Sequence, residues 1–284
     1  MIIEYKDGID PTITGSNPHD YKCMYCDLKL KCEPAKKITK MTMRKVKPHF
    51  IEHKNAMEEI HGPFENWYFK TVTGLNYEGT RLAKCLACGW WSIVEEYWIA
   101  AEWQIWQLFY GLDGIIKDIN VADASVPINE LRSFLIRKYT KRFYVNPKSF
   151  EHLAASVFSD LGYNTVCTGY SKDGGIDLIL NNNSNTIGVQ IKRTKNNIKV
   201  EQIRAFLGAM VVNGYNKGFF VSTSNFQSGC NKIANRVGIE LINASKFYDA
   251  LKEAQIIHYN DEFAIDHSSF SHLHFIGCYP MNSL

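Results

Sequence analysis

The stretch from Asn146 to Ala254 has the most regular apolar pattern in the sequence, and this pattern allows few folds. In its first part, apolar residues follow one another at three, four, seven, eight and eleven positions, the spacing of one face of a helix. These residues are Phe150, Leu153, Ala154, Val157, Phe158 and Leu161. Gly162 comes directly afterwards, so we expect the helix to end there.

Strands and further helices follow this first helix. Strand-like runs occupy residues 163–168, 176–180 and 186–191, and the Asn- and Ser-rich residues 181–185 predict a hairpin turn between the last two. The elements expected after the hairpin are a helix at 203–211, a strand at 219–222, a helix at 229–237, a strand at 239–242 and a helix at 245–254. Helix, hairpin, and then alternating helices and strands predict an α/β fold with a sheet covered on both faces.

The hairpin carries polar residues on an apolar scaffold. Side chains on a strand alternate between faces, so Gln190 and Lys192 point the same way while Val189 and Ile191 face the core. Asp177 lies between two apolar residues of the preceding strand, and the hairpin can bring it against Gln190 and Lys192. Taken alone, the residues leave two interpretations open, a reactive site and a solvent-facing hairpin edge.

The ordered set of motifs in this region resembles the Mrr-type catalytic domain of the restriction-endonuclease-like nucleases, the PD-(D/E)xK superfamily. The residues that carry the resemblance are Phe150-Glu151, Gly162-Tyr163, the D-G-G-I-D run Asp173–Asp177, Gln190-Ile191-Lys192, Val221-Ser222-Thr223-Ser224 and Gly238-Ile239-Glu240-Leu241-Ile242. They cover about a third of the chain. The resemblance implies a three-layer α/β/α core with a central mixed sheet.

The resemblance also implies an active site, which carries over to Glu151, Asp177, Gln190 and Lys192. Two positions depart from the superfamily pattern, since Ile176 stands where its name has proline, and Gln190 replaces the second carboxylate. We expect Glu151 to supply the missing negative charge. Magnesium or manganese prefers oxygen ligands, and Asp177, the Gln190 side chain and the Ile191 carbonyl can supply them. Lys192 would orient the attacking water or stabilise the transition state.

Three cations follow the active-site strand directly, and we expect them to bind DNA phosphates. They are Arg193, Lys195 and Lys199. An alternative is that they are only exposed lysines and an arginine at a sheet edge. His152 follows Glu151, but we expect it to be a histidine on the helix surface because metal-assisted hydrolysis does not need a histidine base.

Two CxxC pairs lie far upstream, at Cys23–Cys26 and Cys85–Cys88. Zinc takes four ligands in a tetrahedron, and each CxxC turn can present two thiolates to one ion. We therefore expect one structural zinc site of Cys23, Cys26, Cys85 and Cys88, similar to a zinc ribbon. Rival ligands lie between the pairs, namely Cys32, His49, His53 and His61.

The charge distribution favours a nucleic-acid partner. The whole chain has a formal charge of only +3, but residues 22–54 hold ten Lys or Arg against three acids. The tail from residue 255 has no Lys or Arg. A solvated basic face is the alternative for such a block. We find neither a signal peptide nor a membrane span, which indicates a cytoplasmic protein whose cysteines are thiols or metal ligands.

These observations divide the chain into four expected parts. They are a basic zinc-ribbon-like domain at 1–94 for DNA recognition, a helical connector at 95–144, the nuclease domain at 145–254 and a docking tail at 255–284. The connector is expected to hold an aromatic-rich helix over Glu95–Tyr110, with Trp98, Trp103 and Trp106 packing between domains, and a second helix from Pro127 toward Tyr139.

The sequence predicts a metal-dependent DNA endonuclease, similar to the type IV enzymes that restrict foreign or modified DNA. Cutting both strands takes two active sites, which is consistent with a homodimer. Two alternatives stay open. One is a non-catalytic nucleic-acid-binding protein that keeps the nuclease fold, and the other is a nuclease that acts on RNA or branched DNA.

Overall fold

The computed structural model divides the chain into two compact units. It describes residues 3–4, 22–61, 73–101, 104–116, 118–169, 174–182, 185–259 and 273–280. Unit 1 consists of residues 1–2, 86–89 and 116–263, and unit 2 consists of residues 3–85, 90–115 and 264–284. None of the helices in these described ranges is both long and apolar enough to cross a membrane.

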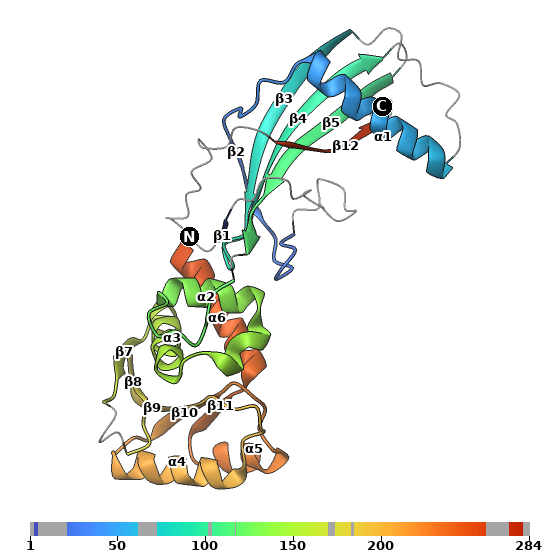
Figure 1. Cartoon of the computed structure of the whole chain (residues 1–284). Helices are drawn as coiled ribbons and strands as arrows, with labels where there is room; N and C mark the ends of the chain where they lie inside the picture. The colour runs from blue at the N-terminus through green and yellow to red at the C-terminus, as the bar shows by residue number, and fades with distance from the viewer. Residues whose placement is uncertain are drawn as a thin grey trace. The chain divides into compact units, whose positions relative to one another are not determined.

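Unit 1 is built on a five-stranded mixed sheet (Figure 1). Its strands, in spatial order, are β11 (Ile239–Ile242), β10 (Lys217–Ser222), β9 (Asn185–Lys192), β8 (Leu178–Asn182) and β7 (Asn164–Cys167). β7, β8 and β9 pair in antiparallel fashion, whereas β9, β10 and β11 are parallel. The expected hairpin is therefore the antiparallel half of a mixed sheet.

Helices cover both faces of this sheet, which makes three layers (Figure 1). One layer holds α2 (Ile128–Arg137), α3 (Pro147–Asp160) and α6 (Ala244–Tyr259), and the other holds α4 (Val200–Val212) and α5 (Ser228–Ala234). A short 3-10 helix, η1 (Tyr139–Tyr144), connects α2 to α3. The predicted α/β/α fold is confirmed, and each element expected from Asn146 to Ala254 is present.

Helix α3 begins and ends at the positions that its sequence predicts. The Asn146 side chain accepts hydrogen bonds from the backbone N–H groups of Lys148 and Ser149, which caps α3. Gly162 follows the last turn with φ of 94°, a conformation that suits glycine. Phe150, Leu153 and Val157 are fully buried, so the predicted apolar stripe is the face of α3 that packs in the core.

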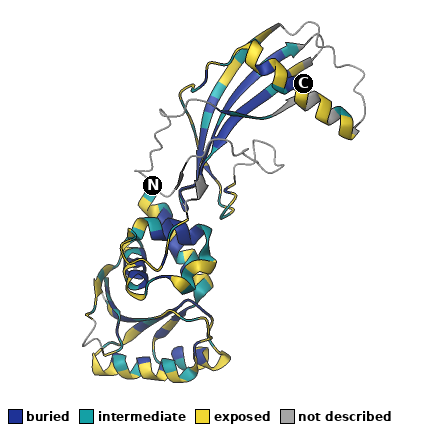
Figure 2. Cartoon of the chain, in the orientation of Figure 1, coloured by how far each residue is buried: buried dark blue, intermediate teal, exposed yellow. Residues whose placement is uncertain are grey.

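Unit 2 is built on a five-stranded antiparallel sheet in the order β12-β5-β4-β3-β2. Its elements are β2 (Lys31–Pro34), α1 (Met43–His61), β3 (Thr73–Lys84), β4 (Trp91–Ala101), β5 (Gln104–Asp113) and β12 (His274–Pro280). Figure 2 shows dark blue, buried strands in its centre and a helix α1 with an exposed outer face. Two further short strands, β1 (Ile3–Glu4) and β6 (Ile115–Ile116), pair with each other.

The helix expected over Glu95–Tyr110 is wrong, because this segment forms β4 and most of β5. Aromatic and β-branched side chains favour extended backbone when neighbouring strands pack against them. One of those neighbours, β12, is distant in sequence from its partner β5, whereas β3 and β4 are joined by the short turn of residues 85–90. Trp106 accordingly packs edge-on against Phe50 of α1, at 5.3 Å between ring centroids, and not between two helices. The helix predicted from Pro127 is confirmed as α2.

Candidate active site and cysteine cluster

Asp177 stands at the start of β8, directly before the first paired residue. Leu178 pairs with Val189, and the Asp177 backbone N–H donates to the Val189 carbonyl at 2.8 Å, which extends the hairpin by one residue. The Asp177 carboxylate then accepts the Ile191 backbone N–H at 2.5 Å. The structure therefore places the predicted acid in contact with β9, the strand that carries Gln190, Ile191 and Lys192.

A glycine turn lies beside this hairpin. Gly174 and Gly175 have positive φ of 54° and 91°. A Cβ atom added to Gly175 would lie 3.6 Å from the Gln190 side-chain nitrogen, so the Gln190 amide packs close to this glycine. Gln190 and Asp177 are half-buried and Lys192 is exposed. The site is open to solvent at its lysine end. Asp173, at the start of the D-G-G-I-D run, lies outside the described residues.

Glu151 lies in the second turn of α3 and is half-buried. Its charge acts on Cys167 of β7, where burial first and Glu151 second raise the pKa of the thiol. Cys167 pairs with Leu178, the residue after Asp177. Glu151 therefore lies near the end of the sheet at which Asp177 precedes β8. His152 is exposed on α3, as predicted.

The strand that ends at Lys192 is held in place by the V-S-T-S motif at the end of β10. The Thr223 backbone N–H donates to the Lys192 carbonyl at 3.1 Å, and the Thr223 hydroxyl donates to the Thr194 carbonyl at 2.9 Å. The Ser224 hydroxyl donates to the Asn196 carbonyl at 2.6 Å. This motif fixes the loop that leaves the active-site strand.

Two of the three cations expected to bind DNA have partners in η1, and sequence reasoning missed this contact. The Arg193 guanidinium donates to the Phe143 carbonyl, and the Lys195 ammonium donates to the Tyr144 hydroxyl at 3.0 Å. Lys199 is exposed at the start of α4. The signal that could have shown the contact is the basic and aromatic composition of residues 139–144.

The donor set at the hairpin fits a hard divalent cation. Asp177 offers a carboxylate, Gln190 an amide oxygen and Ile191 a backbone carbonyl, and magnesium binds oxygen ligands with one or two carboxylates while keeping several waters. The half-buried position of Asp177 and Gln190 leaves room for such waters. These residues can hold the metal that the sequence predicts.

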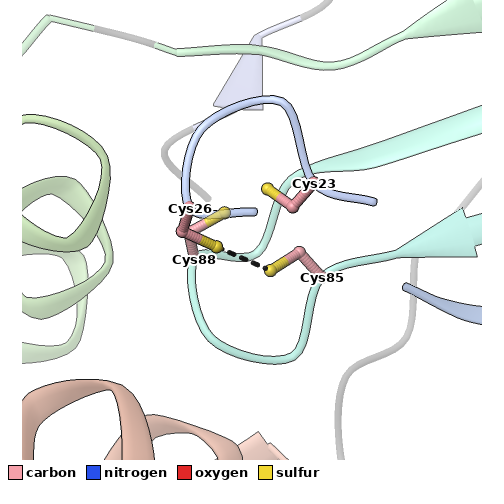
Figure 3. A group of neighbouring side chains, drawn as sticks. All are labelled: Cys23, Cys26, Cys85 and Cys88. Carbon is pink, nitrogen blue, oxygen red and sulfur yellow. Dashed lines mark hydrogen bonds between the residues drawn. The ribbon is translucent and has the colours of Figure 1, made fainter. Parts of the chain in front are cut away.

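The four cysteines of the two CxxC pairs lie together, with their side chains directed toward one another (Figure 3). All four sulfur atoms lie within 4.8 Å of one another, and the Cys26 and Cys85 sulfurs are 3.4 Å apart. A tetrahedral zinc ion with Zn–S bonds of about 2.3 Å separates its sulfur ligands by about 3.8 Å. Cys23, Cys85 and Cys88 are buried and Cys26 is half-buried. The cluster can hold a zinc ion as a closed site.

The two CxxC turns have the same backbone form. In each pair the residue after the second cysteine has positive φ, 58° at Asp27 and 73° at Gly89. The backbone N–H of the first cysteine donates across the turn in both, from Cys23 to Leu28 at 2.8 Å and from Cys85 to Trp90 at 2.6 Å. The repeated geometry presents two thiols per turn to a common point.

Cys32 and His49, two of the rival ligands, are not part of this cluster. Among the described residues, the group of His, Cys, Asp or Glu side chains close enough to share a metal is the set of four cysteines. Cys32 is exposed on β2, and His49 stacks on Phe275 and contacts the Tyr110 hydroxyl at 3.2 Å. The side chains of His53 and His61 lie outside the described residues.

Comparison with known proteins shows that a large part of unit 1 is similar to one protein family. Residues 144–251 match the family model of the Mrr catalytic domain, described as a restriction endonuclease. This segment runs from the end of η1 into α6 and contains the whole mixed sheet with the hairpin. This segment is therefore similar to the Mrr-type restriction endonuclease domain, in agreement with the resemblance in its motifs.

A curated relative matches part of the chain. It is the type IV methyl-directed restriction enzyme EcoKMrr of Escherichia coli (strain K12), 28% identical over 121 residues. The alignment covers 39% of this chain and 40% of the relative, so the chain spans less than half the length of that enzyme.

Solved structures of restriction enzymes also align with the chain. The DNA modification-dependent restriction endonuclease AspBHI is 16% identical, with 60% of each chain covered and a TM-score of 0.35. The MspJI restriction endonuclease, solved with a 27-mer oligonucleotide, is 18% identical, covers 51% of this chain and 36% of its own, and has a TM-score of 0.31. The fold assignment rests on the family match and the strand order given above.

Proposed function

We propose that this protein is a metal-dependent endonuclease that hydrolyses DNA phosphodiester bonds and restricts foreign or modified DNA. The observation that supports it most directly is the hairpin geometry. The Asp177 carboxylate accepts the Ile191 N–H at 2.5 Å, next to Gln190 and Lys192, inside the segment that matches the restriction endonuclease family.

Each residue of the hairpin has a part in the proposed reaction. A bound magnesium or manganese ion would lower the pKa of a water molecule and neutralise charge on the phosphate. Asp177, the Gln190 amide oxygen and the Ile191 carbonyl would hold that ion, and Glu151 would add negative charge from α3. Lys192, exposed at the end of β9, would stabilise the charge that develops on the phosphate in the transition state.

The test is cleavage of supercoiled plasmid, with and without modified bases, in the presence of Mg²⁺ or Mn²⁺. Wild type is compared with Asp177→Asn, which keeps an oxygen to accept the Ile191 N–H, and with Asp249→Asn, an exposed acid of α6. We expect cleavage by wild type and Asp249→Asn and none by Asp177→Asn. Equal cleavage by all three would contradict the site.

The other outcomes select between the alternatives. Salt-sensitive DNA binding without cleavage would indicate a non-catalytic protein with a nuclease fold, which the Gln190 substitution keeps open. Cleavage of RNA or branched DNA alone would change the substrate. Cleavage whose rate rises with the square of protein concentration would support a homodimer.

We also propose that Cys23, Cys26, Cys85 and Cys88 bind a structural zinc ion, and that the N-terminal region contacts DNA. Residues 36–47 supply six exposed cations, Lys36, Lys37, Lys40, Arg44, Lys45 and Lys47, and none of these has a carboxylate partner among the described residues. Cations without carboxylate partners on one short segment favour a polyanionic partner.

A further inference from the structure

Two basic segments that are distant in sequence meet in unit 1 at the end of the active-site strand. Residues 131–150 and residues 178–200 contain no Asp or Glu. The first segment includes η1, and the second includes the loop that follows Lys192. Arg193 and Lys195 of the loop donate hydrogen bonds to Phe143 and Tyr144 of η1. Positive charge from both segments is thus gathered beside the hairpin.

The contact between the segments is fixed by Arg142. Its Nε donates to the Thr223 carbonyl at 2.9 Å, and its guanidinium carbon lies 4.0 Å from the centroid of the Phe143 ring. Thr223 in turn holds the Lys192 and Thr194 carbonyls. Because η1 and the strand end share the same anchor, η1 keeps a fixed position relative to Lys192.

Tyr144 presents an exposed aromatic ring in the middle of this basic surface. Its side chain is 55% exposed, although tyrosine has apolar area that folding usually covers. The Lys195 ammonium lies 3.0 Å from the Tyr144 hydroxyl and 4.6 Å from the ring centroid. The hydrogen bond and charge of Lys195 lower the pKa of Tyr144, which makes its hydroxyl a stronger donor.

The direction of this hydrogen bond leaves a donor free. A lysine ammonium has three protons and no acceptor, so the Tyr144 oxygen must accept from Lys195. The hydroxyl proton of Tyr144 is therefore available to another acceptor, next to the remaining protons of Lys195. Two donors and a positive charge at one exposed point are complementary to a phosphate group.

We propose that Tyr144 and Lys195, supported by Arg193 and the exposed Lys141, bind a phosphate of the DNA backbone that flanks the phosphate to be cut. The proposal rests on the nuclease function given above and adds a positioning site for its substrate. Arg193 then acts mainly as a clamp on η1, whereas Tyr144 and Lys195 make the contact with the strand.

The test measures binding separately from cleavage. Affinity for a duplex oligonucleotide is measured by fluorescence anisotropy in EDTA, over a range of salt concentrations, for wild type, Tyr144→Phe and Lys195→Ala. The matched control is Lys217→Ala, which removes an exposed cation at the opposite end of neighbouring strand β10. Thermal unfolding checks that each variant is folded.

We expect Tyr144→Phe and Lys195→Ala to weaken binding about three- to tenfold relative to Lys217→Ala, since each removes a donor to a charged group. Lys195→Ala should also reduce the slope of log affinity against log salt by about one. In cleavage assays the loss should appear in KM more than in kcat.

Binding by both variants that equals that of Lys217→Ala would overturn the proposal, and so would a wild type that does not bind duplex DNA. A wild type that binds with the expected differences but never cleaves would contradict only the nuclease function. The two failures are therefore distinguishable.

Discussion

The two five-stranded sheets of this protein differ in how deeply their charged and polar side chains are buried. In unit 1, Asp177, Gln190 and Lys192 lie half-buried or exposed at the end of strands, with backbone donors nearby. In unit 2, polar groups are enclosed in the sheet. Glu95 is 0% exposed in the middle of β4 and accepts hydrogen bonds from the Thr39 N–H at 3.1 Å and the Tyr97 hydroxyl at 2.8 Å.

The difference indicates that polar side chains have a structural role in unit 2 and a different role at the hairpin of unit 1. Buried polar groups that are fully paired fix a structure, because leaving any member without its partner costs free energy. Half-buried and exposed groups at a strand end are accessible to a substrate. We therefore expect substitutions in unit 2 to change stability, and substitutions at the hairpin of unit 1 to change activity.

The largest effect is expected at the cysteine cluster. Cys85→Ser should release zinc and destabilise the fold by several kcal/mol, because metal binding at such a site contributes directly to folding. The measurement is zinc content per chain together with thermal unfolding. Cys32→Ser, at an exposed cysteine outside the cluster, is the control and should retain zinc. Retention of zinc by both variants would contradict the proposal that Cys85 is a zinc ligand.

The next effect is on activity alone. Lys192→Ala should lower the cleavage rate about 1,000-fold, since it removes a positive charge from the transition state. Its melting temperature should match that of wild type because the side chain is exposed. Single-turnover cleavage and thermal unfolding give both values. A large drop in melting temperature would show that unit 1, too, uses this residue for stability.

A third effect tests the enclosed carboxylate. Glu95→Ala should destabilise the protein by about 3 kcal/mol, because it leaves the Thr39 N–H and the Tyr97 hydroxyl buried without their acceptor. Glu78→Ala, at an exposed acid on neighbouring strand β3, should change little. Denaturant unfolding measures both. Equal stability of the two variants would contradict the contrast between the sheets.

The smallest effect is a difference in pH dependence between two acids. Burial raises the pKa of Asp113 at the end of β5, so its folded form holds a proton more tightly and its contribution to stability falls as pH rises through that pKa. Asp113→Asn should be about 1 kcal/mol more stable than wild type at pH 7, with the gain shrinking toward pH 4.

Asp123 of unit 1 provides the opposite sign. Hydrogen bonds from Ser125 lower its pKa, so its stabilisation is present at neutral pH and is lost as pH falls. Asp123→Asn should therefore weaken the fall of stability in acid. Thermal unfolding between pH 3 and pH 8 follows both variants, and parallel curves would contradict the assignment.

Much of unit 1 could be predicted from sequence because its signals are local. The stripe from Phe150 to Leu161 belongs to a single helix, and Asp177 and Gln190 belong to a single hairpin. The contact between Tyr144 and Lys195 was not predicted, since the residues are 51 positions apart and the composition of residues 139–144 is the one signal that points to it. The roles of the predicted site residues stay predictions.

Unit 2 was harder to predict for a physical reason. The segment from Glu95 to Tyr110 is aromatic and apolar enough to suit either a helix or a strand. Pairing with Thr73–Lys84 and with His274–Pro280 decides in favour of strands, and the second of these partners lies far along the chain. The cysteine cluster could be predicted across 58 residues because CxxC spacing is itself a strong signal.

The position of β12 has a consequence for the order of folding during synthesis. β12 pairs with β5, yet residues 116–263, which make up most of unit 1, lie between them along the chain. Residues 116–263 therefore leave the ribosome before β12 does. Until then β5 is an unpaired edge, open to pairing with other chains. We infer that unit 1 can complete its sheet before β12 is available to the sheet of unit 2.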